Sequence, residues 1–151
     1  PFTREGLSNA IYEEIKRRRD AFVKKHILIV DEDLNNLKEM KKVLGESFYV
    51  VTMNCCDTSL RYINKYHPDL IIADASMADM AGIKMCAELE KNKEDFGESL
   101  LFMTDNPSEE CVLKCAQFKP EGFLVKPMDM DQLLSQVERI FLVETYSRKN
   151  N

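Results

Sequence analysis

The chain has 151 residues, of which 44% are hydrophobic and 31% are charged, a balance typical of one soluble globular domain and not of a disordered chain. Its net charge of −5 argues against general nucleic-acid binding, which needs a basic surface to neutralise phosphates. The apolar runs are too short to span a membrane, and the first residues do not resemble a signal peptide, so we expect a cytoplasmic domain.

The first segment of the chain lies outside the pattern of the rest. Over residues 1–25, apolar side chains recur at helical spacing at Leu7, Ile11 and Ile15, which predicts one helix. We interpret this segment as a helical extension or linker that could connect to an upstream domain or pair two copies of the chain. The basic run at residues 16–19 is interpreted as a solvated helix face rather than a nucleic-acid or lipid contact.

Short apolar runs alternate with longer amphipathic segments from residue 26 onward. The predicted strands cover residues 26–31, 48–53, 69–74, 99–104 and 121–125, and the predicted helices cover residues 34–44, 58–66, 83–91, 107–118 and 129–143. Continuously apolar strands are covered on both faces, and a strand–helix repeat implies a parallel sheet with right-handed crossovers. We therefore expect one α/β domain at residues 26–144, with a polar, frayed tail at residues 145–151. Its fold would be a flavodoxin-like, doubly wound five-stranded parallel sheet of order 2-1-3-4-5 with five helices.

Five cysteines without a secretory signal favour free thiols in a reducing compartment. Cys111 and Cys115 have the spacing of one helix face, which would also suit a metal or redox pair. The nearest histidine in the sequence, His67, is far from them, so we interpret both as structural thiols.

Acidic and polar side chains stand where the predicted strands end. Asp31 and Glu32 follow the first strand, Asp74 ends the third, Thr104 ends the fourth and Lys126 follows the fifth. The carboxyl ends of parallel strands meet at one edge of a sheet, and the first and third strands are neighbours in this order. A single acid there would be interpreted as a turn residue or a helix N-cap. The whole set on one edge instead predicts a site at which the three acids converge.

Several carboxylates at one point repel each other unless a cation is present, and hard oxygen ligands favour Mg²⁺. Carboxylates are also nucleophiles that form acyl-phosphates, and phosphoryl transfer depends mainly on positioning and charge neutralisation. Lys126 would add a positive charge for the phosphoryl oxygens, and the Thr104 hydroxyl could hydrogen-bond the new phosphate. The sequence therefore predicts that Asp74 accepts a phosphoryl group beside Mg²⁺.

At these residues the chain resembles the receiver domain of two-component response regulators, over about residues 26–143. The segments that carry the resemblance are ILIVDED (27–33), PDLIIADASM (68–77) with Gly82, LFMT (101–104) and GFLVKP (122–127). Each segment is modest alone, but their order and spacing together make the match specific.

The resemblance implies a role for each residue of the predicted site. Asp74 would be the phospho-acceptor, Glu32 would bind Mg²⁺ directly, and Asp31 would bind it largely through water. Ser76 would offer its backbone carbonyl to the metal, and Thr104 would be the hydroxyl that moves toward the phosphoryl group.

The remaining matches extend the resemblance to the last strand. Lys126 matches the lysine of the family, Phe123 matches its switch aromatic, which changes rotamer with phosphorylation, and Pro127 would follow through a cis peptide bond. Two positions depart from the family pattern. Ala78 stands where a proline is usual, and Asp105 stands where a small residue usually controls access to the acceptor, so a carboxylate there could slow phosphorylation.

The implied function is a two-state signalling switch that is not an enzyme. A sensor histidine kinase or a phosphotransfer protein would be the phosphodonor, and a downstream protein or an attached output domain would respond. Direct nucleic-acid binding is not expected, and a homodimer is possible. Slow self-dephosphorylation would be tuned by Ser76 and Asn106.

Two other hypotheses remain at this point. One is a phosphorylation-independent interaction domain, for which Asp105 and Ala78 are the only support. The other is an enzyme such as a phosphatase, which the sequence does not favour because it lacks a second nucleophile–base pair, a glycine-rich phosphate loop and a cofactor fingerprint. His26 and His67 both fall away from the predicted site.

Overall fold

The computed structural model describes residues 10–11, 14, 25–91 and 98–150, and the helix predicted for residues 1–25 lies almost wholly outside them. The strands are β1 (His26–Val30), β2 (Tyr49–Met53), β3 (Leu70–Asp74), β4 (Ser99–Thr104) and β5 (Gly122–Val125). The helices are α2 (Leu34–Leu44), α3 (Cys56–Tyr66), α4 (Ala81–Lys91), α5 (Glu109–Ala116) and α6 (Met130–Asn150), and a 3₁₀ turn, η2 (Ala78–Met80), precedes α4.

The five strands form one parallel sheet in the order β2-β1-β3-β4-β5, which confirms the predicted topology. β1 and β3 are neighbours at the middle of the sheet, and both are almost wholly buried. β2 and β3 follow one another in the sequence but lie on opposite sides of β1 in the sheet. This arrangement places the residues that follow β1 directly beside those that end β3.

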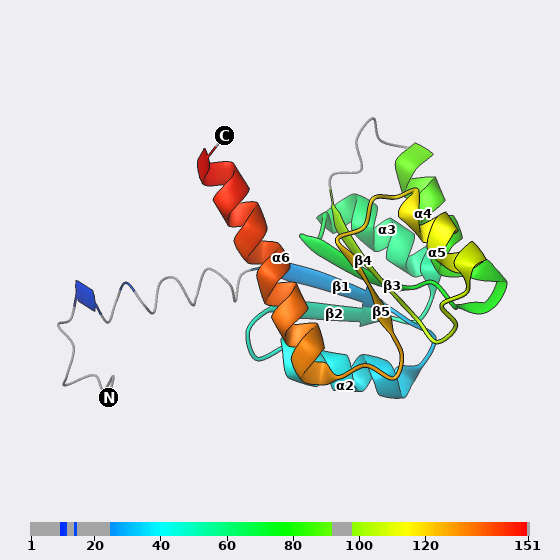
Figure 1. The fold of residues 1–151 in the computed structure, drawn as a ribbon, viewed down its shortest axis with the longest axis horizontal. Helices are drawn as coiled ribbons and strands as arrows, with labels where there is room; N and C mark the ends of the chain where they lie inside the picture. The colour runs from blue at the N-terminus through cyan, green and yellow to red at the C-terminus, as the bar shows by residue number, and fades with distance from the viewer. Residues whose placement is uncertain (1–9, 12–13, 15–24, 92–97, 151) are drawn as a thin grey trace.

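The helices cover both faces of the sheet, as the apolar character of the strands predicts (Figure 1). On one face, α2 and α6 pack over Ile27 and Ile29, with Phe141 among the largest buried side chains of that core. On the other face, α3, α4 and α5 pack over Leu28 and Phe102. Alternate residues of β1 therefore point into two separate cores, and the strand is fixed from both sides.

Several helices start at residues other than those that the sequence predicted. α5 begins at Glu109 rather than Pro107, since the Ser108 hydroxyl accepts a hydrogen bond from the backbone N–H of Cys111 and so caps the helix. α3 begins at Cys56, two residues earlier than predicted. α4 begins at Ala81, because the chain first makes the 3₁₀ turn.

The end of the last helix also differs from the prediction. α6 continues to Asn150, where a frayed tail had been predicted to begin at Thr145. Leu142 and Val143 are both exposed on this helix, and the helix extends away from the body of the domain (Figure 1). In the part of the chain that the structure describes, no helix is both long enough and apolar enough to cross a membrane.

Candidate functional site

The predicted acids Asp31 and Asp74 lie side by side at the carboxyl edge of the sheet. Asp31 directly follows β1 and Asp74 is the last residue of β3, and these strands pair in register up to Val30 and Ala73. Both carboxylates are nearly inaccessible, with residue exposures of 1% for Asp31 and 4% for Asp74. Two buried carboxylates at one place carry a large repulsive and desolvation cost unless something neutralises them.

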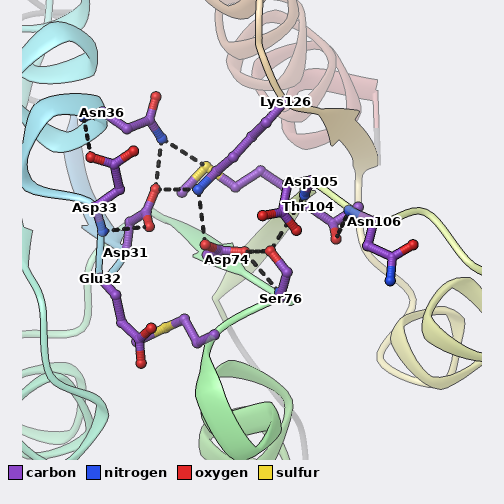
Figure 2. A network of polar contacts seen from close by, with 12 residues as sticks. Asp31, Glu32, Asp33, Asn36, Asp74, Ser76, Thr104, Asp105, Asn106 and Lys126 are labelled. Carbon is purple, nitrogen blue, oxygen red and sulfur yellow. Dashed lines mark hydrogen bonds and ion pairs between the residues drawn. The ribbon is translucent and has the colours of Figure 1, made fainter.

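Lys126 supplies the neutralising charge. Its Nζ donates to Asp31 Oδ2 at 2.7 Å and to Asp74 Oδ2 at 2.9 Å, so a single ammonium joins the two acids (Figure 2). Burial alone lowers the pKa of Lys126, but the hydrogen bonds and negative charges of both aspartates outweigh it, and the pKa lies above its ordinary value. Lys126 therefore stays charged at physiological pH. The peptide bond from Lys126 to Pro127 is cis, as the resemblance implied.

Asp31 is held by three donors. Besides Lys126, the backbone N–H of Asp33 donates to Oδ1 at 2.9 Å, and the side-chain amide of Asn36 donates to Oδ2 at 2.6 Å. The role of Asn36 was missed at the level of sequence, where the residue was only part of a helix. A signal was present, because Asn36 is a polar residue one helical turn before the buried Met40.

Asp74 is held from the other side by Ser76. The backbone N–H and the hydroxyl of Ser76 donate to Asp74 Oδ1 at 2.8 Å and 2.6 Å. The Ser76 hydroxyl in turn accepts from the backbone N–H of Asp105 at 3.3 Å. Both oxygens of Asp74 therefore have partners. The resemblance implied a role for the Ser76 carbonyl only, and the contacts of its N–H and hydroxyl are an addition.

Glu32 follows β1 as predicted, but its carboxylate does not join the other two. Its Oε1 accepts from the backbone N–H of Ala78 at 3.3 Å, and Figure 2 shows the side chain directed away from Asp31 and Asp74. Within the described residues, no group of three or more His, Cys, Asp or Glu side chains is arranged to hold a metal ion. Of the three acids expected to converge, Asp31 and Asp74 therefore do so. The Lys126 ammonium lies between these two, and the Glu32 carboxylate accepts its hydrogen bond from Ala78 instead.

Thr104 and Phe123 lie farther along the same edge. Thr104 ends β4 and is fully buried, and its hydroxyl accepts a hydrogen bond from the backbone N–H of Asn106 at 3.1 Å. Phe123 is half-buried in β5, opposite Phe102 of β4, and packs against the α3–α4–α5 core. Among the described residues, the Thr104 hydroxyl makes no hydrogen bond to Asp74, and Phe123 lies two residues before the end of β5.

A cleft of about 540 Å³ opens over Asp31, Asp74, Ser76 and Lys126. Its lining is acidic, with Asp31, Glu32, Asp74 and Asp105 set against the single ammonium of Lys126. Asp105 is exposed at the rim, as its position after β4 predicted. The imbalance of charge favours a cation as ligand. The buried Asp74 accepts hydrogen bonds from both the Lys126 ammonium and the Ser76 hydroxyl.

The other predicted residues lie away from the cleft. His26 begins β1 at the opposite edge of the sheet, where its Nε2 lies 2.6 Å from the Tyr62 hydroxyl, and His67 ends α3. All five cysteines are free thiols, with Cys115 buried and Cys111 half-buried on α5. The interpretation of this pair as structural thiols agrees with their burial.

The chain forms a parallel five-stranded sheet with two acids bridged by a lysine at its carboxyl edge. Comparison with known proteins identifies the family to which this arrangement belongs. The family model for the response regulator receiver domain matches residues 27–138. The chain belongs to this family, and it is a receiver domain of the two-component response regulator type.

The relatives of this chain include both long and short proteins. The transcriptional regulatory protein GlrR of Escherichia coli K12 is 31% identical over 114 residues, which cover 75% of this chain and 25% of that protein. The chemotaxis protein CheY-3 of Vibrio cholerae is 26% identical over 117 residues, which cover 76% of this chain and 90% of that protein. The chain thus spans about a quarter of the first relative and most of the second.

Solved structures share the fold. A CheY-like receiver domain protein from Methanospirillum hungatei JF-1 superposes with a TM-score of 0.74 at 22% identity, covering 82% of this chain and 98% of that one. The beryllofluoride-activated receiver domain of DrrB gives a TM-score of 0.67 at 22% identity, covering 78% of this chain and 97% of that one. At this level of identity the likeness extends to the fold alone.

Proposed function

We propose that this domain is a phosphorylation-controlled switch in which Asp74 accepts a phosphoryl group. The observation that carries the proposal is the Lys126 ammonium, which bridges the buried Asp31 and Asp74 at 2.7 and 2.9 Å. A carboxylate nucleophile beside a fixed cation, at the open edge of a parallel sheet, is the arrangement that phosphoryl transfer to an acid requires.

The residues around the cleft fit Mg²⁺, because the candidate donors are all hard oxygens. The carboxylates of Asp31, Glu32 and Asp74 and the carbonyl of Ser76 would hold the ion. Glu32 is exposed, and within the described part of the chain its carboxylate accepts one hydrogen bond, from the backbone N–H of Ala78 at 3.3 Å. A turn of this side chain into the cleft would break that single contact. When bound, Mg²⁺ would supply positive charge to the phosphoryl oxygens during transfer.

The transfer itself is a displacement at phosphorus. One oxygen of Asp74 forms the new O–P bond while the bond between phosphorus and the donor atom breaks, and the leaving group takes that electron pair. A carboxylate leaves as the anion, and an imidazole nitrogen takes a proton from solvent. Oδ1 of Asp74 accepts two hydrogen bonds from Ser76, whereas Oδ2 accepts one from Lys126 and so keeps a lone pair for the attack. Lys126 remains paired with Asp31, and the third N–H of its ammonium can meet a phosphoryl oxygen.

The response would pass through Thr104 and Phe123. The Thr104 hydroxyl accepts a hydrogen bond from the Asn106 N–H, and a dianionic phosphoryl group nearby would offer it a stronger partner to which it can donate. Movement of Thr104 would open space next to the half-buried Phe123 in the adjacent strand. The domain is thus proposed as a non-enzymatic switch in the cytoplasm. A histidine kinase or phosphotransfer protein would serve as donor, and an output domain or protein would respond, with self-dephosphorylation tuned by Ser76 and Asn106.

A second candidate function is a receiver-like interaction domain that works without phosphorylation. The observation in its favour is Asp105, whose exposed carboxylate lines the same cleft as Asp74 and repels anionic donors. The two functions differ in whether the site binds Mg²⁺ and accepts a phosphoryl group.

Labelling with a small phosphodonor such as acetyl phosphate tests the proposal. We expect Mg²⁺-dependent labelling of the wild-type chain and none of Asp74→Asn, because the amide is not a nucleophile. Asp79→Asn is the matched control: it changes an exposed aspartate of the 3₁₀ turn whose positive φ asparagine also tolerates. Labelling that persists in Asp74→Asn would place the acceptor elsewhere.

An NMR titration separates the two candidate functions. Beryllofluoride with Mg²⁺ should shift the resonances of Thr104 and Phe123 if the site is a working switch. A chain that binds no Mg²⁺ and shows no such shifts would support the phosphorylation-independent domain instead.

A further inference from the structure

Asn36 contacts the acidic pair as closely as any residue of the predicted site does. Its Nδ2 donates to Asp31 Oδ2 at 2.6 Å, and the same nitrogen lies 3.5 Å from Met40 Sδ and 3.8 Å from Met103 Sδ. An ionised carboxylate only accepts hydrogen bonds, so the amide nitrogen and not its oxygen must face Asp31. The chemistry of Asp31 therefore fixes the orientation of this amide.

Local structure explains how a helix residue reaches the end of β1. Asp33 caps α2, with its side chain accepting from the backbone N–H groups of Asn35 and Asn36. Side chains on a helix lean toward its N-terminus, so Asn36 in the first turn points back toward the strand end. It also lies one turn before the buried Met40, where a polar side chain needs a partner.

Asn36 and Lys126 donate to the same oxygen of Asp31. Asp31 Oδ2 receives both Asn36 and Lys126, while Oδ1 receives the backbone N–H of Asp33 (Figure 2). With donors on both oxygens, the carboxylate cannot rotate about its bond to Cβ without breaking at least one of these contacts. Lys126, held by the same oxygen, is kept within reach of Asp74.

We propose that Asn36 is a positioning residue of the site: it fixes the Asp31 carboxylate in the orientation from which this group meets both Lys126 and Mg²⁺. The inference rests on the proposed function for the identity of the metal. Residues that hydrogen-bond a metal ligand and so orient it typically lower metal affinity by about 10–100-fold when they are removed. The alternative role for Asn36 is to fill space between two methionine side chains, and the two roles predict different effects of substitution.

Two substitutions separate the hydrogen bond from the space that it occupies. Asn36→Leu keeps the size of the side chain beside Met40 and Met103 but has no donor, and Asn36→Ala removes both. We expect both variants to bind Mg²⁺ at least about tenfold more weakly than the wild type, as measured by NMR titration without a phosphodonor. Asn64→Ala, at an exposed position of α3, controls for the gain in helix propensity. Urea unfolding verifies that each variant is folded.

The kinetics of labelling give a second readout. If Asn36 acts on the metal site, both variants should need about tenfold more Mg²⁺ for half-maximal labelling while keeping a rate close to that of the wild type at saturating Mg²⁺. A role in packing alone would leave Asn36→Leu with wild-type Mg²⁺ affinity, and that result would overturn the inference.

The outcomes also distinguish this inference from the proposed function. Labelled variants with wild-type Mg²⁺ affinity would overturn the role of Asn36 and leave phosphorylation of Asp74 standing. A wild-type chain that binds Mg²⁺ but is not labelled would overturn the proposed function, and weakened binding in both variants would still support the role of Asn36. A wild-type chain without Mg²⁺ affinity would overturn both.

Discussion

At the scale of single residues, the stability of the site depends on how its buried negative charges are neutralised. Asp31 and Asp74 are both buried, and Lys126 is the cation that contacts them, with a side chain that is only 15% exposed. The remaining oxygens accept hydrogen bonds from Ser76 and from the backbone N–H of Asp33, and Asn36 donates to the Asp31 oxygen that Lys126 also contacts. Each acid is thus tolerated because donors surround it, and removal of a donor should cost more than an ordinary surface contact.

Replacement of Lys126 by methionine tests this account. The apolar side chain keeps the volume but leaves two buried carboxylates unneutralised, so we expect Lys126→Met to lower the free energy of unfolding by about 3 kcal/mol without metal. Urea unfolding in the presence of a chelator measures it. Lys114→Met is the control, because the ammonium of Lys114 pairs with the exposed Glu110 and such a pair contributes about 1 kcal/mol or less. Equal effects of the two substitutions would refute the account.

At the scale of elements, the site depends on how closely α4 approaches the end of β3. Gly82 lies in the first turn of α4, and a Cβ atom on it would overlap the backbone oxygen of Asp74. The loop between the two elements is short and includes residues with positive φ, Asp79 at 56° and Met80 at 57°. A side chain at residue 82 must therefore move either the helix or the strand end that carries the acceptor.

We expect Gly82→Ala to lower the free energy of unfolding by about 1–3 kcal/mol, the usual cost of overpacking, despite the higher helix propensity of alanine. Labelling of Asp74 should fall as well, because the acceptor would be displaced. Lys84→Ala, at an exposed position of the same helix, should change stability by no more than about 0.5 kcal/mol. If Gly82→Ala is as stable and as readily labelled as the wild type, the close approach is not needed.

At the scale of the whole molecule, two cores on opposite faces of one sheet hold the fold. The core under α3, α4 and α5 contains buried thiols, and burial raises the pKa of Cys86 to about 12, with smaller contributions from Cys115, Cys56 and Glu90. The folded chain therefore keeps a proton that the unfolded chain loses near pH 9. This contribution to stability is complete below about pH 9 and is lost as the pH rises to about 12.

The stability of the wild-type chain should accordingly fall between pH 9 and 12, with Cys86 contributing at most about 4 kcal/mol to the loss. Cys86→Ala should lower stability at neutral pH but flatten the alkaline decline, as measured by urea unfolding under reducing conditions. Cys55→Ala should leave the decline unchanged, because this thiol is exposed and hydrogen bonds, chiefly from the backbone of Thr58, lower its pKa. An unaltered decline in Cys86→Ala would show that other groups cause it.

Much of this protein was determined by the sequence alone. Continuous apolar strands alternating with amphipathic helices allow few folds besides a doubly wound parallel sheet, so the strand order and the edge on which Asp31, Asp74 and Lys126 meet were predictable. Only the tertiary structure decided the contacts within that edge. Glu32 bonds to Ala78 instead of joining the other acids, and Asn36 reaches Asp31 from the first turn of α2. Periodicity and spacing place a residue on an element, but the direction of a side chain depends on which donors other segments bring within hydrogen-bonding distance.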